Sequence, residues 1–401
     1  MKKTGQNIIT TEMILQPVSH SNPGGSSFSQ RVKLLTPPSR AEITKVLYIM
    51  GLEQDLGDRW LLEPYEAFGR REDMVIICAE HRGYGKSIFG GDQTCPDYIS
   101  IPEALADYHA VREKYAERFP VDWIVYGCSY GGALSINYAH TYPGDMGAVI
   151  CSSGVVDWNA MLPEYDVVAR ENLGAGLYER LCVHVDRLSP AEPFDKNWYG
   201  RELIYAFTTG VCQYRENQNL IGLINALAKL PTSAFIGALR AIDAMFTGRA
   251  VSEYAESNRA LTLSNTQAET CRWSWRVWRY QQAFQTGTFW APSEERSIYR
   301  RSEADWLDEC QRLFGREATV FGSGTGWDVR AMAGELSVPM VYVRGDKDPW
   351  REVGLEEDFP LKKGTIMNIA GGFHGPERYP DTGPSVFAEA MKYLEEGRAE
   401  G

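Results

Sequence analysis

Residues 123–132 read Trp123-Ile124-Val125-Tyr126-Gly127-Cys128-Ser129-Tyr130-Gly131-Gly132 and decide the fold. The run begins as an apolar strand and continues past Gly132 into a segment with helical composition. Glycines two residues either side of Ser129 let strand and helix approach closely enough for a tight, strained turn. A plain glycine-rich turn would also carry these letters, but the strand before and the helix after favour a nucleophile elbow at Ser129.

The rest of the chain shows short β-rich runs that alternate with helical patterns. Near-continuous apolar strands of this kind indicate a parallel sheet buried on both faces. Helical periodicity is clear over 101–118, over 220–227 and 234–246, and in a closing amphipathic segment at 385–396. The expected strands lie at 31–35, 46–50, 74–78, 123–126, 148–151, 339–344 and 365–369.

The pattern predicts one α/β domain interrupted by a helical insertion. Strand character stops near residue 157 and returns near 339. We expect a core built from residues 28–156 and 336–401, a helical cap over 157–335, and a flexible lead-in over 1–27. Together with the elbow, this organisation predicts the α/β-hydrolase fold, a mostly parallel sheet with an inserted helical cap domain.

Ser129 needs a base and an acid, and the sequence offers both in the order Ser, acid, His. Asp348 follows the strand at 339–344, and His374 follows the strand at 365–369. Each lies just past the carboxyl end of a strand, where open α/β sheets place their sites. Asp346 competes for the acid role, and Asp348 is favoured because Pro349 would stiffen its turn.

The oxyanion of an acyl intermediate needs two backbone amides. One is expected from Tyr130, directly after the nucleophile, and the other from the loop after an early strand. That loop begins at Gly51, and the sequence leaves Leu52 and Glu53 as alternatives for the second donor.

Composition and charge exclude several classes of protein. Of the 401 residues, 44% are hydrophobic and 23% charged, as in soluble globular proteins. The net charge of -12 argues against nucleic acid or an anionic membrane as partner, because phosphate binding draws on clustered Lys and Arg. Neither a membrane helix, which needs ~18 apolar residues, nor a signal-peptide pattern is recognisable, so we expect a cytoplasmic protein.

The cysteines predict neither a metal site nor disulfides. They lack the CxxC spacing of a zinc site, and several lie inside apolar runs, as buried free thiols do in a reducing compartment. We expect no metal and no cofactor. The eight cysteines are at positions 78, 95, 128, 151, 182, 212, 271 and 310.

Several motifs resemble the serine peptidase family of prolyl carboxypeptidase and dipeptidyl peptidase II, and the elbow and the Arg-Gly turn are shared with proline iminopeptidase-like hydrolases. EHRGYGKS at 80–87 resembles the family's EHRYYGxS, and EALAD at 103–107 resembles EQALAD. The elbow resembles GGSYGG, and DPW at 348–350 resembles the segment with the catalytic aspartate, 26 residues before His374. In the cap, WRYQ at 278–281 with Gly287 resembles WxYQxCTEFG, and CQRLFG at 310–315 resembles CxxxFG.

The resemblance implies a serine exopeptidase that cleaves small peptides after proline near one end. The chain departs from the family in the cap, where Ala283 and Gln285 replace its cysteine and glutamate. Cys310 thereby loses the partner that the resemblance implies for a disulfide, which fits a reducing compartment. Gln285 also changes the charge expected near the substrate pocket. Glu53 could bind a substrate ammonium, or it could be a solvated loop carboxylate.

An aromatic wall is expected around the substrate. Trp275 and Trp278 share a helix face, which usually means core packing, but a cap over an active site needs apolar surface, and proline's ring suits aromatic walls. We expect Trp275, Trp278 or Trp350 to line the pocket, with Glu53 and Gln285 as further substrate-binding candidates.

Two other functions compete with the peptidase. The same triad could serve an esterase, thioesterase or acyltransferase acting on a small-molecule acyl substrate, because the cap sets the substrate. A catalytically silent binding protein is the third hypothesis, and the intact Ser-Asp-His set argues against it. A homodimer is compatible with each.

Overall fold

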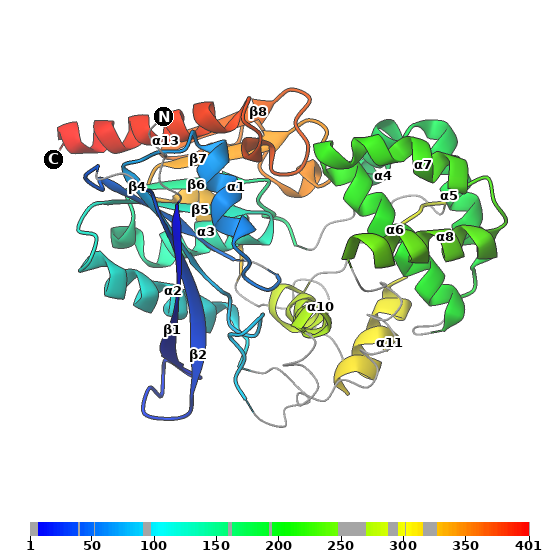
Figure 1. Cartoon of the computed structure of the whole chain (residues 1–401), viewed down its shortest axis with the longest axis horizontal. Coiled ribbons are helices and arrows are strands. Elements are labelled where there is room, and N and C mark those ends of the chain that lie inside the picture. Colours follow the sequence, from blue (N-terminus) through cyan, green and yellow to red (C-terminus); the bar gives the residue numbers. More distant parts are fainter. Residues whose placement is uncertain are drawn as a thin grey trace.

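The computed structural model describes residues 7–38, 41–51, 53–90, 98–158, 163–191, 195–247, 270–287, 296–300, 302–315 and 327–400. Within them the chain forms a sheet at one side of the molecule and a group of helices at the other (Figure 1).

The sheet has eight strands in the order β1-β2-β4-β3-β5-β6-β7-β8. β1 to β2 and β2 to β4 pair antiparallel, and the remaining pairs are parallel. This order, with the serine turn directly after β5, is that of the α/β-hydrolase fold and confirms the predicted fold class. The strands are β1 (Ile8–Pro17), β2 (Ser27–Thr36), β3 (Lys45–Ile49), β4 (Met74–Ala79), β5 (Asp122–Cys128), β6 (Ala148–Ser152), β7 (Met340–Gly345) and β8 (Gly364–Ile369).

Helices bury both faces of the sheet. Because successive strand side chains point to opposite faces, Tyr48 packs in one cluster and its neighbour Leu47 in the other. The Tyr48 face is covered by α2 (Ile101–Ala116), α3 (Tyr130–Thr141) and α12 (Val329–Glu335), and the Leu47 face by α1 (Arg59–Ala67) and α13 (Gly383–Glu400). This two-sided burial explains why the central strands are apolar along their whole length.

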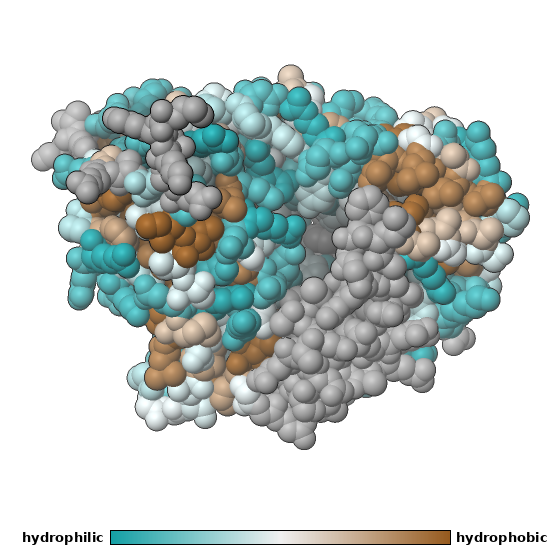
Figure 2. Space-filling view, viewed as in Figure 1, coloured by the Kyte–Doolittle hydropathy of each residue, from teal (hydrophilic) through white to brown (hydrophobic). Residues whose placement is uncertain are grey.

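Most of the inserted helices form a separate group on the right of Figure 1, while α10 (Thr270–Gln281) is drawn nearer the centre of the view. Their outer surface carries brown, hydrophobic side chains (Figure 2), and the leucines exposed in this part of the chain include Leu223 and Leu230. The helices are α4 (Pro163–Leu173), α5 (Ala175–Arg187), α6 (Lys196–Gln213), α7 (Ile221–Leu227), α8 (Thr232–Thr247), α10 (Thr270–Gln281) and α11 (Glu303–Phe314).

An ion pair joins the two points where the chain leaves and re-enters the core. Arg330 donates from Nε to Oδ1 of Asp157 at 3.0 Å and from Nη2 to Oδ2 at 2.6 Å. Such a bidentate arrangement restricts both partners more than a single contact would. Arg330 also donates to Glu356 at 2.6 Å, so the base of the insertion is fixed to the loop that follows β7.

Two predicted boundaries are wrong. Residues 8–17 form β1, the edge strand, where a flexible lead-in was expected. Its alternation is weak because part of each face is solvent-exposed, and pairing with β2 through the turn at 18–26 holds it in place. The core also resumes at α12, before residue 336, because Val329 and Ala333 pack into the same cluster as α3.

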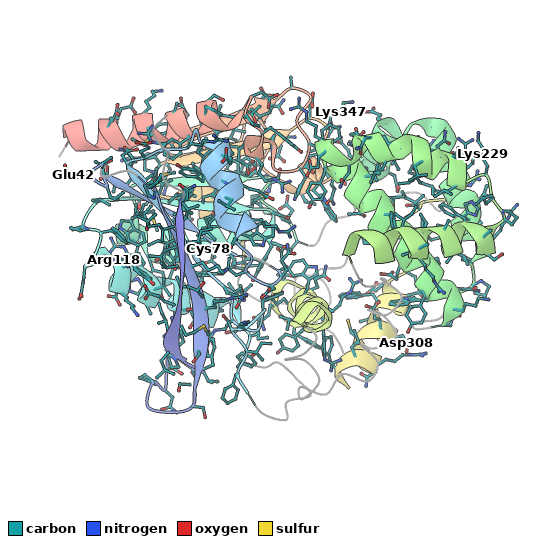
Figure 3. The ribbon with its side chains drawn as sticks, viewed as in Figure 1. Glu42, Cys78, Arg118, Lys229, Asp308 and Lys347 are labelled. Atoms are coloured by element: carbon teal, nitrogen blue, oxygen red, sulfur yellow. The ribbon has the colours of Figure 1, made fainter. Side chains whose placement is uncertain are left out.

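Cysteine burial agrees with the sequence analysis where the structure describes it. Cys78 lies inside the sheet of the core (Figure 3) and is buried as a free thiol, as is Cys151, and Cys310 is also buried. Cys95 and the side chain of Cys271 lie outside the described residues. Within the described ranges, no helix is long and apolar enough to cross a membrane, and His, Cys, Asp and Glu side chains form no group that could hold a metal ion.

Candidate active site

Ser129 occupies a strained turn between β5 and α3, as the sequence predicts. Its φ is 58° and its ψ is -122°, a conformation that a residue with a Cβ adopts only at a cost. The turn is so tight that a Cβ on Gly127 would lie 2.0 Å from the carbonyl oxygen of Gly131. The Ser129 amide donates to the carbonyl of Ser152 at 2.9 Å, which ties the elbow to the end of β6.

His374 and Asp348 meet at the same end of the sheet. Nδ1 of His374 lies 2.9 Å from Oδ2 of Asp348, and the amide of Trp350 donates to the other carboxylate oxygen at 3.0 Å. His374 is 5% exposed and Asp348 is 1% exposed. Burial opposes ionisation of Asp348, but His374 and the hydrogen bonds outweigh it and hold the pKa of the carboxyl below its usual value.

The side chain that His374 contacts is therefore Asp348. Asp346, the alternative acid, lies at the same turn, and its backbone carbonyl accepts a hydrogen bond from Arg351 at 2.7 Å. The arrangement of His374 and Asp348 is the one in which a carboxylate fixes the imidazole tautomer and leaves Nε2 for the nucleophile.

The helical insertion braces the loops that carry these two residues. The His374 amide donates to the carbonyl of Gln213, the last residue of α6, at 2.9 Å. Asn172 of α4 donates to the carbonyls of Cys212 at 2.9 Å and of Lys347 at 2.8 Å. Lys347 lies where the core faces α4 (Figure 3). Displacing α4 or α6 would therefore disturb both triad loops.

The structure describes two of the three residues that the sequence offers as oxyanion donors, Tyr130 and Glu53. The Tyr130 amide lies at the first position of α3, beside Ser129, where helix N-termini favour negative charge. Leu52 lies outside the described residues. Glu53 lines the same cavity as Ser129, while the Gly51 amide is already bonded to the Tyr108 hydroxyl at 3.0 Å.

The Tyr130 side chain belongs to a buried polar network that reaches the helical insertion. Nδ1 of His81 lies 2.7 Å from the carbonyl of Arg82 and must donate to it, which leaves Nε2 to accept from Tyr130 at 3.2 Å. Gln281 of α10 donates to the Tyr130 hydroxyl at 2.7 Å and accepts from Tyr84. Burial lowers the pKa of His81 to about 4, so the network is neutral at pH 7.

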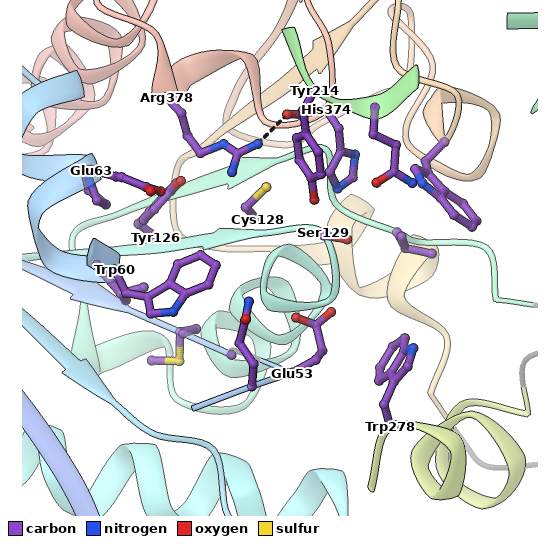
Figure 4. A pocket seen from close by; sticks show the side chains of 18 of the residues that line it. Glu53, Trp60, Glu63, Tyr126, Cys128, Ser129, Tyr214, Trp278, His374 and Arg378 are labelled. Carbon is purple, nitrogen blue, oxygen red and sulfur yellow. Dashed lines mark hydrogen bonds between the residues drawn. The ribbon is translucent and has the colours of Figure 1, made fainter. Parts of the chain in front are cut away.

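A cavity of about 360 Å³ opens over Ser129 and His374 (Figure 4). Its core wall includes Trp60 and Glu63 of α1, and the insertion contributes Tyr205, Trp278 and Gln282. Trp278 of α10 and Glu53 both lie below Ser129 in the close-up view (Figure 4). The cavity therefore combines the nucleophile, an aromatic wall and a carboxylate.

The structure brings some of the predicted substrate residues together and separates others. Trp278, Trp350 and Glu53 line the cavity. The Gln285 side chain is directed to the start of α2, where its oxygen accepts from the Ile101 amide at 3.3 Å. The side chain of Trp275 lies outside the described residues. Ala283, which replaces the family's cysteine, packs in one buried cluster with Cys310.

The charged side chains that line the cavity differ in whether the protein supplies a partner for them. Arg378 donates to the carbonyl of His374 at 2.9 Å (dashed in Figure 4), and Arg279 pairs with Glu309 at 3.2 Å. Both cations are thus held by groups of the protein. Within the described part of the chain, Glu53 forms no ion pair. Burial raises the pKa of its carboxyl, and nearby His374 opposes that rise.

Several residues of the site escaped the sequence analysis. Tyr214 and Arg378 line the cavity, with the Arg378 guanidinium over the Tyr214 ring at 5.1 Å from its centroid, and Gln281 reaches the elbow from α10. Gln281 was visible as part of the WRYQ motif, but nothing in its spacing indicates which core residue it contacts. Tyr214 and Arg378 carry no local pattern that could have found them.

Comparison with known proteins supports the resemblance. Residues 24–183 match the family model of serine carboxypeptidase S28. A protein of Caenorhabditis elegans named "Putative serine protease K12H4.7" is 28% identical over 109 residues, 26% of this chain and 21% of its own length. The chain therefore matches about a fifth of the length of this curated relative.

Solved structures with similar folds include two hydrolases. Proline iminopeptidase of Mycobacterium smegmatis aligns with a TM-score of 0.46 and 10% identity, over 96% of this chain and 100% of its own. A probable hydrolytic enzyme of Pseudomonas aeruginosa aligns with a TM-score of 0.45 and 14% identity, over 96% and 94%. The sheet order is that of the α/β-hydrolase fold, His374 and Asp348 meet at the carboxyl end of this sheet, and the family match covers the part of the chain that contains Ser129.

Proposed function

We propose that this chain is a serine hydrolase, and that it acts as an exopeptidase that releases a short amino-terminal fragment from a peptide by cleaving after proline. The observation that carries the proposal is the carboxylate of Glu53 in the cavity that also contains Ser129 and His374. A carboxylate that has no ion-pair partner among the described residues and that shares a cavity with a nucleophile suits a substrate with a free ammonium group.

The chemistry follows from the positions of the three side chains. His374 takes the proton of the Ser129 hydroxyl, whose oxygen attacks the carbonyl carbon of the scissile bond. Asp348 keeps its charge because the pKa of its carboxyl is held low, and it stabilises the imidazolium that forms. The Tyr130 amide, with Leu52 or Glu53 as second donor, stabilises the oxyanion. His374 then protonates the leaving amine, and water releases the acyl group.

Cavity size supports a short substrate. A volume of about 360 Å³ lies near the lower end of the ~300–1,000 Å³ typical of small-molecule sites. The aromatic rings of Trp278 and Trp350 line it, and such rings pack well on the rigid ring of proline. These features favour a few residues at a peptide end over a long chain passing through.

The charge of Glu53 supports selection of the amino end. The arginines at the cavity, Arg279 and Arg378, already bind a carboxylate and a backbone carbonyl of the protein, so neither is as available for a substrate carboxylate. An ammonium close to Glu53 would stabilise the ionised carboxylate, whose pKa burial raises. Binding of a cation and ionisation of Glu53 would therefore favour each other.

The proposal is tested with matched substrates and two variants. We expect Xaa-Pro amides with a free amino group to be cleaved, and their N-acetyl forms to be cleaved poorly. Glu53→Gln should remove most of that difference, mainly through KM, while Ser129→Ala abolishes turnover and labelling by a fluorophosphonate. Rapid turnover of p-nitrophenyl esters with every amide left intact would contradict the peptidase function and favour an esterase or thioesterase.

We also propose a cytoplasmic location. Cys78 and Cys151 are buried free thiols. Free buried thiols are typical of reducing compartments. Recovery of the protein in a membrane or secreted fraction of the native cells would contradict this location.

A further inference from the structure

Ser153 occupies an unusual position directly after β6, the strand beside the one that carries the elbow. Its φ is 44°, in the left-handed region where a residue with a Cβ is strained. The residue is 7% exposed, and it is absent from the lining of the substrate cavity. A strained, buried serine at the carboxyl edge of the sheet calls for a compensating interaction.

The contacts of Ser153 reach both loops of the triad. Its amide donates to the carbonyl of Val343 in β7, the strand before Asp348, at 2.7 Å. Its Oγ accepts from the amide of Gly375, the residue after His374, at 3.0 Å. The hydroxyl proton remains to be donated, and the hydroxyl is near enough to Asp348 to help hold the pKa of that carboxyl below its usual value. One hydroxyl therefore binds the loop of the base and stabilises the charge of the acid.

We propose that Ser153 is a positioning residue of the triad, whose hydroxyl holds the Asp348 carboxylate and the His374 loop in the arrangement in which the two side chains meet. The strained backbone aims Oγ between the two loops. The amide of Ser153 binds β7 and its hydroxyl binds the His374 loop, so this one residue joins two strand ends. This inference rests on the Ser129, His374 and Asp348 triad of the proposed function, and it is independent of the substrate.

The hydroxyl also affects the charge of Asp348. A hydroxyl beside a carboxylate favours its ionised form, and Ser153 is among the groups that lower the pKa of the Asp348 carboxyl. Without Ser153 Oγ, the pKa of that carboxyl would rise. A residue that only filled space would not shift this pKa.

The experiment measures the rate at which a fluorophosphonate labels Ser129, as a function of pH, because labelling reports the triad without any assumption about the substrate. Ser153→Ala removes the hydroxyl and keeps the strain. Ser153→Gly removes the hydroxyl and relieves the strain, since glycine adopts positive φ freely. We expect both variants to be labelled more slowly by a factor of about 10 to 100, the cost of a small misplacement of catalytic groups. We also expect the acid limb of the pH profile, the range in which the labelling rate falls as pH is lowered, to lie at higher pH than in the wild type.

Ser152→Ala is the matched control. Ser152 is the neighbouring buried serine, and its hydroxyl donates to Glu377 instead of the triad loops. We expect this variant to lose stability and to keep the acid limb of the wild type. Thermal unfolding of all three variants separates an effect on folding from an effect on the triad.

The outcomes are distinct. If the wild type is labelled and both Ser153 variants label at its rate with an unshifted limb, the positioning role is overturned while the triad stands. If Ser153→Gly is labelled at the wild-type rate and is at least as stable as the wild type, the hydroxyl is not needed and the backbone strain is the only effect of Ser153. The inference is then overturned as well. If the wild type is not labelled at all, the proposed function fails and this inference fails with it.

Discussion

Nε2 of Gln281 lies 2.7 Å from the hydroxyl oxygen of Tyr130, so the last residue of α10 contacts the first residue of the elbow helix. Both side chains are buried, and the bond joins the insertion to the segment that carries Ser129. The arrangement couples the cap to the nucleophile through one amide side chain, which also accepts from Tyr84.

Gln281→Ala should weaken both stability and activity. The substitution leaves the hydroxyls of Tyr130 and Tyr84 with fewer partners in the interior, which costs about 1–3 kcal/mol for each unsatisfied group. We expect a lower free energy of unfolding in urea and slower fluorophosphonate labelling of Ser129. Gln285→Ala is the control, since Gln285 bonds the Ile101 amide away from the cavity. An equal loss of labelling in both variants would mean that the Gln281 contact has no special effect on the elbow.

Asp348→Asn should lower turnover by roughly four orders of magnitude, the cost of a wrong imidazole tautomer in a serine triad. Asp346→Asn should change turnover only a few-fold, because the carboxylate that accepts the hydrogen bond of the His374 ring is that of Asp348. Steady-state kinetics on one ester substrate measure both, with thermal unfolding to show that each variant is folded. A larger loss at Asp346 than at Asp348 would reverse the assignment of the acid.

Glu352 should make the protein less stable as pH rises towards neutrality. Its carboxylate accepts from the amides of Glu164 at 2.9 Å and Tyr165 at 3.3 Å, at the start of α4. Burial raises the pKa of Glu352 to about 7, with the backbone bonds and Arg351 opposing and Glu164 adding to the rise.

The sign of the effect follows from this raised pKa. The folded protein binds the proton of Glu352 more tightly than the unfolded chain, so its contribution to stability is complete below about pH 4.5 and is lost as pH rises to about 7. The melting temperature of the wild type should therefore fall over this range more steeply than that of Glu352→Gln. Parallel curves for the two proteins between pH 4 and 8 would show that the carboxyl does not titrate in this way.

Ala283→Cys should form a disulfide with Cys310 when the protein is oxidised. The two residues pack in one buried cluster on α11 and the turn after α10, and the resemblance described above implies a cysteine pair at these positions. A native-like disulfide typically stabilises by about 2–4 kcal/mol. Mass spectrometry under non-reducing conditions detects the bond, and the double variant with Cys310→Ser should lose it together with the gain in melting temperature.

The parts of the fold that sequence predicts well are those dictated by local patterns. The central strands and the helices at 101–116 and 383–400 follow from apolar runs and helical periodicity, which reflect burial on two faces and on one face respectively. The edge strand at Ile8–Pro17 was missed, because an edge strand with two partly exposed faces has neither pattern.

The residues of the candidate site likewise fall into those that local sequence patterns predict and those that they do not. Ser129, Asp348 and His374 each follow a strand and are therefore found by their place along the chain. Ser153 also follows a strand, and the polar Ser152-Ser153-Gly154 after an apolar run is the signal that could have indicated it. The sequence alone assigned it no partner, since the Gly375 amide that its hydroxyl binds lies 222 residues further along the chain.

By itself, the sequence determined the parallel sheet, the elbow at Ser129 and the order of the triad, because strand burial and tight turns impose patterns on neighbouring residues. Only the tertiary structure decided that Glu53 and Trp278 share the cavity of Ser129, that Gln285 turns away to α2, and that Ser153 contacts both triad loops. The reason is physical: these side chains meet through packing between distant segments, and such packing leaves no periodic signal in the residues beside them.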